Sequence, residues 1–327
     1  MYRLLVISPL LCAVLAATSF AQLAVKEVVV QGASLNDEYG GGTTCGVDGQ
    51  VYRRPSGGPL TSVMRVSPDG STLLFTLPEH VFPDLIAPVG TGVNIMSTTY
   101  SPGEHRFHFQ MFDFDSQANL LSQTEGTLPV RPTGMAALPS GRTIVIGTHS
   151  NDPYNQNEWE YGFAILDSKD KVVKSVDLPL PPGGGGWTFA SPIAAGDGVA
   201  YVMLHDDNPP QTAIATIAEK GNKNLDINVI AAPPNFGTRE HNQWVFGPAV
   251  AVEIYHYSDE RPHITLRFDE YDLGSGGKIA TRSGPGTGFQ FGCYLGDEFS
   301  MLAHSAHVDP ARRLSSETLR LVTARLQ

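Results

Sequence analysis

Four segments of the sequence place a histidine shortly before an aspartate and a proline. They read THSNDP from Thr148, LHDDNPP from Leu204, YHYSDERP from Tyr255 and AHSAHVDP from Ala303. The residues that could do chemistry in them are His149, Asp152, His205, Asp207, His256, Asp259, His304 and Asp309. Imidazole binds transition metals, and carboxylates suit Ca²⁺ or Mn²⁺. One interpretation is therefore a partial ring that holds a divalent metal or an acidic sugar.

Two other groups of residues could bind a ligand. The first combines acids, an imidazole and an amide: Asp37, Glu38, Glu240, His241 and Asn242. Such side chains could hold Ca²⁺, although Asn and Asp also favour ordinary solvated loops. The second is Trp159, in the aromatic and acidic stretch SNDPYNQNEWEYG. Its ring could stack on a sugar, pack on a partner or cover a hydrophobic gap at the surface.

A repeated hairpin pattern indicates which elements position these residues. Five segments read as a strand, a polar turn and a second strand. They begin at Val63, Phe109, Phe163, Thr212 and Ile264. Their turns recur at steps of 47 to 53 residues, and two more short strands are predicted before each hairpin. Units of four antiparallel strands at this period are typical of a β-propeller.

The last unit is incomplete, and the first residues of the mature chain can complete it. SETLRLVTARL, residues 316–326, reads as a third strand with no fourth after it. LAVKEVVVQG, from Leu23, contains a lone β-branched strand over residues 25–30. We expect this strand to become the fourth strand of the last blade. The predicted fold is therefore all-β, a six-bladed β-propeller of four-stranded antiparallel blades closed by the N-terminal strand.

The same closure brings two cysteines into equivalent places. Cys45 falls in the first strand of blade one, and Cys293 in the first strand of blade six. Those blades are neighbours in a closed ring, so a disulfide is possible if the Cα atoms lie within about 4.4–6.8 Å. Two buried free thiols are the other possibility.

The pattern resembles the six-bladed propellers of exported bacterial proteins, at the level of the TolB-like, NHL-like and gluconolactonase-like superfamilies. SPDGS, residues 67–71, looks like the turn of TolB-type repeats. The resemblance covers the mature chain as architecture, and it transfers no catalytic residue. It implies that ligands bind on one face of the propeller. On that face lie the loops between the second and third strands of each blade and the loops that link one blade to the next. The histidines would lie one strand out from the axis, where we expect neighbouring copies to stand too far apart to share one ion at about 2.1 Å. Alternatively, each histidine could hydrogen-bond the backbone of its own loop. Duplication of an ancestral repeat would then have copied this histidine into the other units.

The ends and the charge of the chain limit its location and partners. Residues 1–21 combine Arg3, an apolar stretch and small residues before Gln22, which predicts a cleaved signal peptide. Residues 22–327 then form one propeller domain in the periplasm or outside the cell. A net charge of −11 disfavours nucleic acid, and no later apolar run is long enough to span a membrane.

The predicted function is that of a binding scaffold whose loop-rich face engages a protein or a carbohydrate. The alternative is a metal-dependent hydrolase, lactonase or sugar lyase, with Ca²⁺ or Mn²⁺ at the axial mouth and a nearby acid or imidazole as general base. No cofactor other than such a metal is indicated, and the sequence contains no serine-nucleophile signature of the G-x-S-x-G type.

Overall fold

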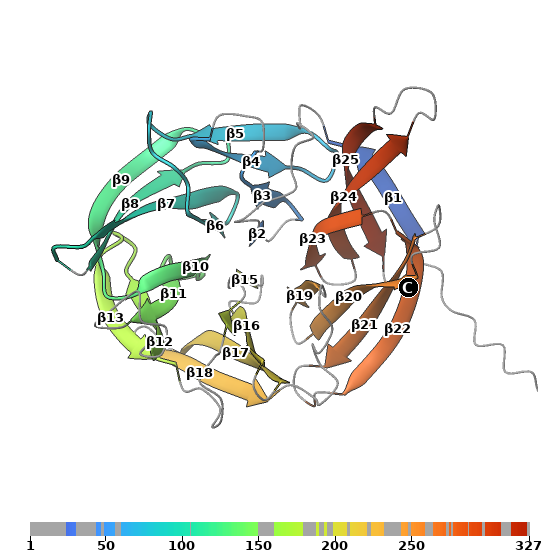
Figure 1. Cartoon of the computed structure of the whole chain (residues 1–327). Coiled ribbons are helices and arrows are strands. Elements are labelled where there is room, and N and C mark those ends of the chain that lie inside the picture. The colour runs from blue at the N-terminus through green and yellow to red at the C-terminus, as the bar shows by residue number, and fades with distance from the viewer. Residues whose placement is uncertain are drawn as a thin grey trace, which may run out of the picture.

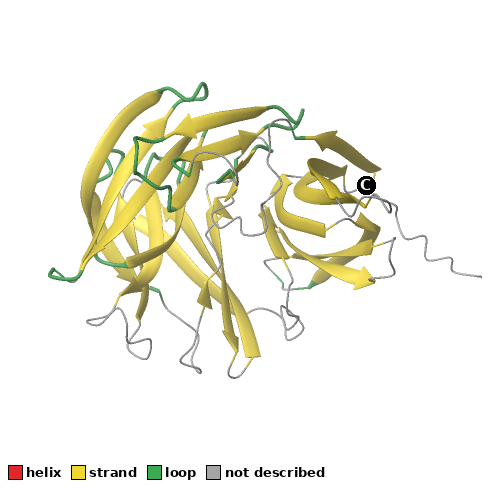
Figure 2. Cartoon of the chain, turned by 45° about the horizontal axis from the view of Figure 1, so that its top comes forward, coloured by secondary structure: helices red, strands yellow, loops and turns green. Residues whose placement is uncertain are grey.

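The protein is all-β in the part of the chain that the structure describes (Figure 2). The computed structural model describes residues 24–30, 44–46, 49–55, 60–104, 106–149, 160–178, 188–189, 193–194, 199–207, 210–220, 224–231, 243–247, 250–258, 264–272, 275, 277–286, 288–295, 298–308 and 315–325. Within these ranges there are 25 strands. The same residues contain no helix of the length and apolar character that a membrane crossing requires.

The strands form six antiparallel sheets, numbered here along the chain. Sheet 1 contains β2 (Thr44–Cys45), β3 (Val51–Arg53), β4 (Ser62–Val66) and β5 (Thr72–Thr76). Sheet 2 contains β6 (Leu85–Val89), β7 (Gly92–Ser101), β8 (Arg106–Phe114) and β9 (Leu120–Leu128). Sheet 3 contains β10 (Arg131–Ala137), β11 (Thr143–His149), β12 (Glu160–Leu166) and β13 (Val172–Asp177).

The second half of the chain supplies the other three sheets. Sheet 4 contains β14 (Thr188–Phe189), β15 (Ile193–Ala194), β16 (Val199–Asp207), β17 (Pro210–Lys220) and β18 (Asn224–Ala231). Sheet 5 contains β19 (Gln243–Gly247), β20 (Val250–Ser258), β21 (Ile264–Asp272) and β22 (Lys278–Gly286). Sheet 6 contains β23 (Gly288–Leu295), β24 (Glu298–Val308), β25 (Ser315–Arg325) and β1 (Ala24–Val29).

Figure 1 shows the sheets arranged around a central axis. The first strands β2, β6, β10, β15, β19 and β23 lie nearest the centre, and β5, β9, β13, β18, β22 and β1 lie at the rim. The five hairpins predicted from the repeat are present as the two outer strands of sheets 1 to 5. Sheet 4 differs from the expected four strands, because its first strand is split into β14 and β15, which pair with successive parts of β16. The sequence between them includes Pro192, which has no N–H for a ladder hydrogen bond.

Aspartates stabilise the turns of several outer hairpins. Oδ1 of Asp115 accepts hydrogen bonds from the backbone N–H groups of Gln117 and Asn119, at 2.9 and 2.8 Å. Oδ1 of Asp167 does the same for Lys169 and Lys171. Short acidic side chains that bind the backbone in this way favour turns over continued strand. The polar residues between the strand patterns therefore act as the local signal that ends one strand and begins the next.

The N-terminal strand β1 pairs antiparallel with β25, as the sequence predicted. The register joins Ala24 to Arg325 and Val29 to Arg320. β1 also packs on the next sheet, against the β4–β5 turn at Gly70, which has a φ of +82°. A Cβ atom there would lie 2.5 Å from both Cγ1 of Val28 and the carbonyl oxygen of Val29. The turn therefore requires glycine for its conformation and for this close approach.

Apolar cores join neighbouring sheets face to face. One core, between sheets 1 and 2, contains Phe75 and Phe112, and another, between sheets 2 and 3, contains Phe109. Further cores lie between sheets 3 and 4 and between sheets 6 and 1. Successive residues along a strand of sheet 2 therefore point in turn toward sheet 1 and toward sheet 3. Phe109 and Met111 of β8 face sheet 3, whereas Phe112 faces sheet 1.

Polar side chains also reach from one sheet to the next. Arg65 of β4 donates from Nη1 to two backbone carbonyl oxygens of sheet 2, at 3.0 and 3.3 Å. Between sheets 3 and 4, Nη2 of Arg142 lies 2.7 Å from Oε1 of Glu219, and both side chains are largely buried. Burial tends to raise the pKa of Glu219, but hydrogen bonds from Ser140 and Arg142 outweigh it and lower that pKa. These contacts hold adjacent sheets at fixed positions in addition to the apolar cores.

Sheets 2 and 3 meet through two neighbouring carboxyl groups. Oγ1 of Thr124, on β9, donates to Oδ2 of Asp170 at 2.9 Å. Oδ2 of Asp113, on β8, accepts a hydrogen bond from Ser122, while its Oδ1 is buried and has no hydrogen-bond partner. Burial raises the pKa of Asp113. Burial also raises the pKa of Asp170, and the charge of Asp113 adds to that increase. At this junction the charge of Asp113 therefore disfavours ionisation of Asp170.

Candidate functional site

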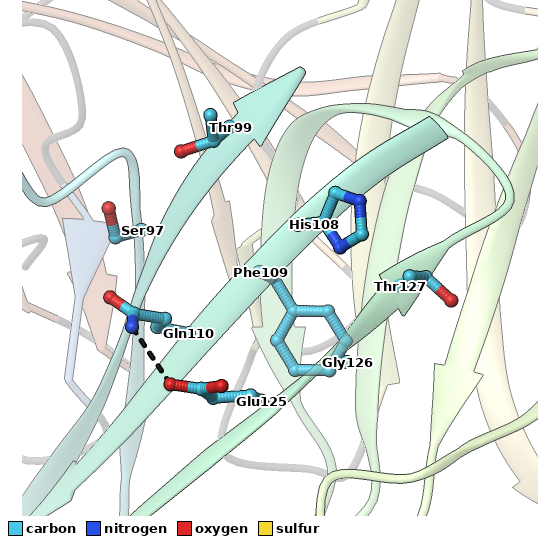
Figure 3. A pocket seen from close by; sticks show the side chains of 8 residues that line it. All are labelled: Ser97, Thr99, His108, Phe109, Gln110, Glu125, Gly126 and Thr127. Carbon is cyan, nitrogen blue, oxygen red and sulfur yellow. Dashed lines mark hydrogen bonds between the residues drawn. The ribbon is translucent and has the colours of Figure 1, made fainter. Parts of the chain in front are cut away.

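A grid of polar side chains covers one half of sheet 2 on the face turned toward sheet 1. Pairing across β7, β8 and β9 places six of them in two rows. The outer row is Thr99, His108 and Thr127, and the inner row is Ser97, Gln110 and Glu125. These residues line a pocket of about 450 Å³ together with Phe109 and Gly126 (Figure 3).

The alternation of residue types along the strands produces this grid. In β8, His108 and Gln110 alternate with Phe107, Phe109 and Met111, so the polar residues share one face. The aromatic residues on the other face pack toward sheet 3. There the ring of Phe109 lies over Gly126. A Cβ atom at residue 126 would lie only 2.7 Å from that ring, so the position leaves no room for a side chain. The same strand thus supplies an apolar core on one side and a hydrogen-bonding wall on the other.

The pocket lies where sheet 2 continues beyond the apolar core that it shares with sheet 1. Leu77 and Val81, in the connection from β5 to β6, belong to or pack on that core. The pocket residues lie near the end of β7, the start of β8 and the end of β9. This is the end of the sheet that carries the β7–β8 connection and the link to the next sheet. The loops of this end form the face that the resemblance implied for a ligand.

Two hydrogen bonds organise the side chains of the grid. Nε2 of Gln110 donates to Oε1 of Glu125 at 3.0 Å, and Figure 3 shows the amide oxygen on the opposite side, toward Ser97. Nε2 of His108 donates to Oε2 of Glu104 at 2.9 Å, and both of these side chains are partly exposed. The pocket therefore presents carboxylate, amide, imidazole and hydroxyl groups to solvent, and Lys and Arg are absent from its described lining.

Asp84, which follows the connection that leaves sheet 1, has a structural role near this pocket. Its Oδ2 accepts hydrogen bonds from the backbone N–H and the hydroxyl of Thr98, at 2.6 and 2.8 Å. Arg54 donates from Nη2 to the Asp84 carbonyl oxygen at 2.9 Å. These bonds fix the start of β6 against β7, and so they position the strand that carries Ser97 and Thr99.

The four repeated histidines occupy corresponding strands. His149, His205, His256 and His304 lie on β11, β16, β20 and β24. Each of these is the second strand of its sheet, as predicted, and Asp207 is the last residue of β16. The side chains of these four histidines lie outside the part of the chain that the structure describes, so a shared metal or sugar site stays a prediction.

The remaining predicted site residues lie outside the described residues. They are Asp37, Glu38, Asp152, Trp159, Glu240, His241, Asn242, Asp259 and Asp309. Among the side chains that are described, no group of three or more His, Cys, Asp or Glu residues is placed to hold a metal ion. Cys45 lies in β2 and Cys293 in β23, and these two strands contact each other.

None of the pocket residues was predicted from the sequence as a site. The signal was the alternation of polar and apolar residues in three successive strands of the second unit. This alternation identifies a pocket only once the register of the three strands is known, because a shift of one residue would turn the polar side chains of a strand to the other face of the sheet. Attention to histidines followed by aspartate and proline missed His108, which is followed by phenylalanine.

No protein-family model and no curated protein matches the chain. A protein of unknown function from Dyadobacter fermentans has a similar structure, with 12% identity, a TM-score of 0.50 and coverage of 93% of this chain and 99% of that one. A subtype N11 neuraminidase-like protein of A/flat-faced bat/Peru/033/2010 (H18N11) is 9% identical, with a TM-score of 0.48, over 87% of this chain and 86% of its own. A protein of unknown function from Bacteroides caccae is 11% identical, with a TM-score of 0.45, over 75% and 81%. Similarity at these identities concerns the fold alone, which is all-β and propeller-like.

Proposed function

We propose that the chain is an exported β-propeller that binds carbohydrate in the pocket of sheet 2. The observation that carries the proposal is the grid of six hydrogen-bonding side chains on one concave face. A sugar hydroxyl donates and accepts, so it matches a wall of hydroxyl, amide, imidazole and carboxylate groups. The core of a protein–protein interface is instead apolar and poor in charge. The pocket therefore favours the carbohydrate over the protein ligand that the sequence also allowed.

The architecture proposed with this function is a closed ring of six blades. Six sheets, the β1–β25 pairing and the apolar cores that join neighbouring sheets support it. A disulfide between Cys45 and Cys293 would link the first and last blades. Cys45 is disulfide-bonded, and the other cysteines of the sequence are Cys12 and Cys293. Peptide mapping without reductant tests the pair, and recovery of residue 293 as a free thiol would exclude it.

Export rests on the predicted leader over residues 1–21. In a bacterial host, we expect processing after Ala21 and recovery of the mature protein in the periplasm or medium. Sequencing the amino terminus of that protein is the test. An intact start at Met1 in protein from the cytosol would contradict both the leader and the location.

The binding test is titration calorimetry with neutral and charged oligosaccharides, on the whole mature protein. Thr127→Val removes one pocket hydroxyl without changing side-chain volume, and we expect it to weaken binding about threefold to tenfold. Thr76→Val is the matched control, because Thr76 is exposed on β5 and does not line the pocket. Equal affinity in both variants would place the sugar elsewhere, and no binding of any sugar would refute the function.

A further inference from the structure

The inner row of the pocket is rich in hydrogen-bond acceptors. One N–H of the Gln110 amide is donated to Glu125, so this row offers a ligand the amide oxygen of Gln110 and the carboxylate of Glu125, beside the second N–H of the same amide. Ser97 adds a hydroxyl that can accept as well as donate. A neutral sugar would satisfy such a row only in part, because each hydroxyl brings one donor. A ligand group with several donors and no acceptor fits it better.

The charge near this row is negative. Glu125 is exposed on β9, the outer strand of sheet 2, and the amide of Gln110 is its neighbour across the strands. Arg106 precedes His108 on β8 and so lies at the outer rim, about 13 Å along the strand from Gln110. Glu104, in the adjoining connection, provides a second carboxylate at that rim. The whole chain also carries a net charge of −11, which repels anionic ligands.

We propose that the pocket selects a sugar that carries a protonated amino group, and that Glu125 is the residue that sets this preference. An ammonium has three donors and no acceptor, so it can bind the carboxylate of Glu125, the amide oxygen of Gln110 and the hydroxyl of Ser97 together. Hydrogen bonds between charged partners are stronger than those between neutral ones. The inference rests on the proposed function, because it specifies the class of sugar that the same pocket binds.

The experiment compares three probes of equal length: oligomers of glucosamine, of N-acetylglucosamine and of glucose. Calorimetry at pH 6 and low salt should give an affinity about tenfold higher for the glucosamine oligomer, in line with one charge-assisted hydrogen bond. Raising the salt concentration should reduce this preference, because the carboxylate is exposed. Glu125→Gln keeps the shape and an acceptor oxygen but removes the charge, so it should bring the three affinities together.

Glu79→Gln is the matched control, because it removes an exposed carboxylate from the connection between β5 and β6, which does not line the pocket. It should keep the preference for glucosamine oligomers. Equal affinities in the unmodified protein, or a preference that survives Glu125→Gln, would overturn the inference and leave the proposed function standing. Failure of all three oligomers to bind would overturn both. Circular dichroism of each variant shows that the comparison is made between folded proteins.

Discussion

Replacing Asp113 by asparagine should make the protein more stable at neutral pH. One carboxylate oxygen of Asp113 is buried with no hydrogen-bond partner, and the charge of Asp113 raises the pKa of the neighbouring Asp170. The asparagine keeps an oxygen for Ser122 and replaces the other by an NH₂ group. That group has no charge to repel Asp170, and it can donate a hydrogen bond toward it.

The size of the gain follows from the burial. A buried polar atom without a partner costs about 1–3 kcal/mol. Because the rest of the Asp113 side chain is partly exposed, we expect the lower end, about 1 kcal/mol, in the free energy of unfolding by urea. The corresponding rise in melting temperature is about 2–4 °C for a domain somewhat smaller than this chain.

The change in stability with pH tests the direction of this prediction. Burial, opposed by the hydrogen bond from Ser122, raises the pKa of Asp113 above 3.8 in the folded state. The folded protein therefore holds a proton more tightly than the unfolded chain, and the cost of ionisation is present at neutral pH. It is relieved as the pH falls through the raised pKa toward 3.8. The advantage of Asp113→Asn should accordingly be largest near pH 7 and shrink as the pH falls toward 3.8.

Asp115→Asn, two residues further along the chain, is the matched control with the opposite sign. Hydrogen bonds from the side chain and backbone of Asn119 lower the pKa of Asp115. Its carboxylate therefore stabilises the fold above pH 3.8, and this contribution is lost as the pH falls through the depressed pKa. The variant should lose stability at pH 7 and converge with the parent in acid. The reasoning is refuted if Asp113→Asn is less stable than the parent at pH 7, or if both variants shift in the same direction.

Two further substitutions test the contacts between sheets. Glu219→Gln removes the charge that pairs with the largely buried Arg142, and urea unfolding should show a loss of about 2 kcal/mol, below the range for fully buried pairs. A change under about 0.5 kcal/mol would show that the pair adds nothing to the apolar core. Gly70→Ala should cost at least about 1 kcal/mol, because its Cβ would meet Val28 and the φ is positive. Gly103→Ala is the control, since nothing lies within 4 Å of the added atom, and equal losses in both would contradict the packing of β1 on this turn.

The repeat gave correct strand order because its signal is local. Each outer hairpin has its own turn chemistry, such as the aspartate before Gln117, so counting turns placed the second strands and their histidines without tertiary information. The split of β14 from β15 was missed because each of these strands has only two residues, too few to show a strand pattern in the sequence. The pocket was missed because it depends on the register of three strands. The conflict between Asp113 and Asp170 arises only when two sheets pack together.

The pairing of β1 with β25 makes one sheet depend on residues at opposite ends of the polypeptide. During synthesis, residues 24–29 emerge long before residues 315–325, so the early strand must wait without its partner. Contacts between such distant residues form slowly, and an unpaired strand edge invites association with other chains. A circular permutant that joins the two ends directly and opens the chain elsewhere would make this contact local. It should refold faster and aggregate less than the natural order of residues.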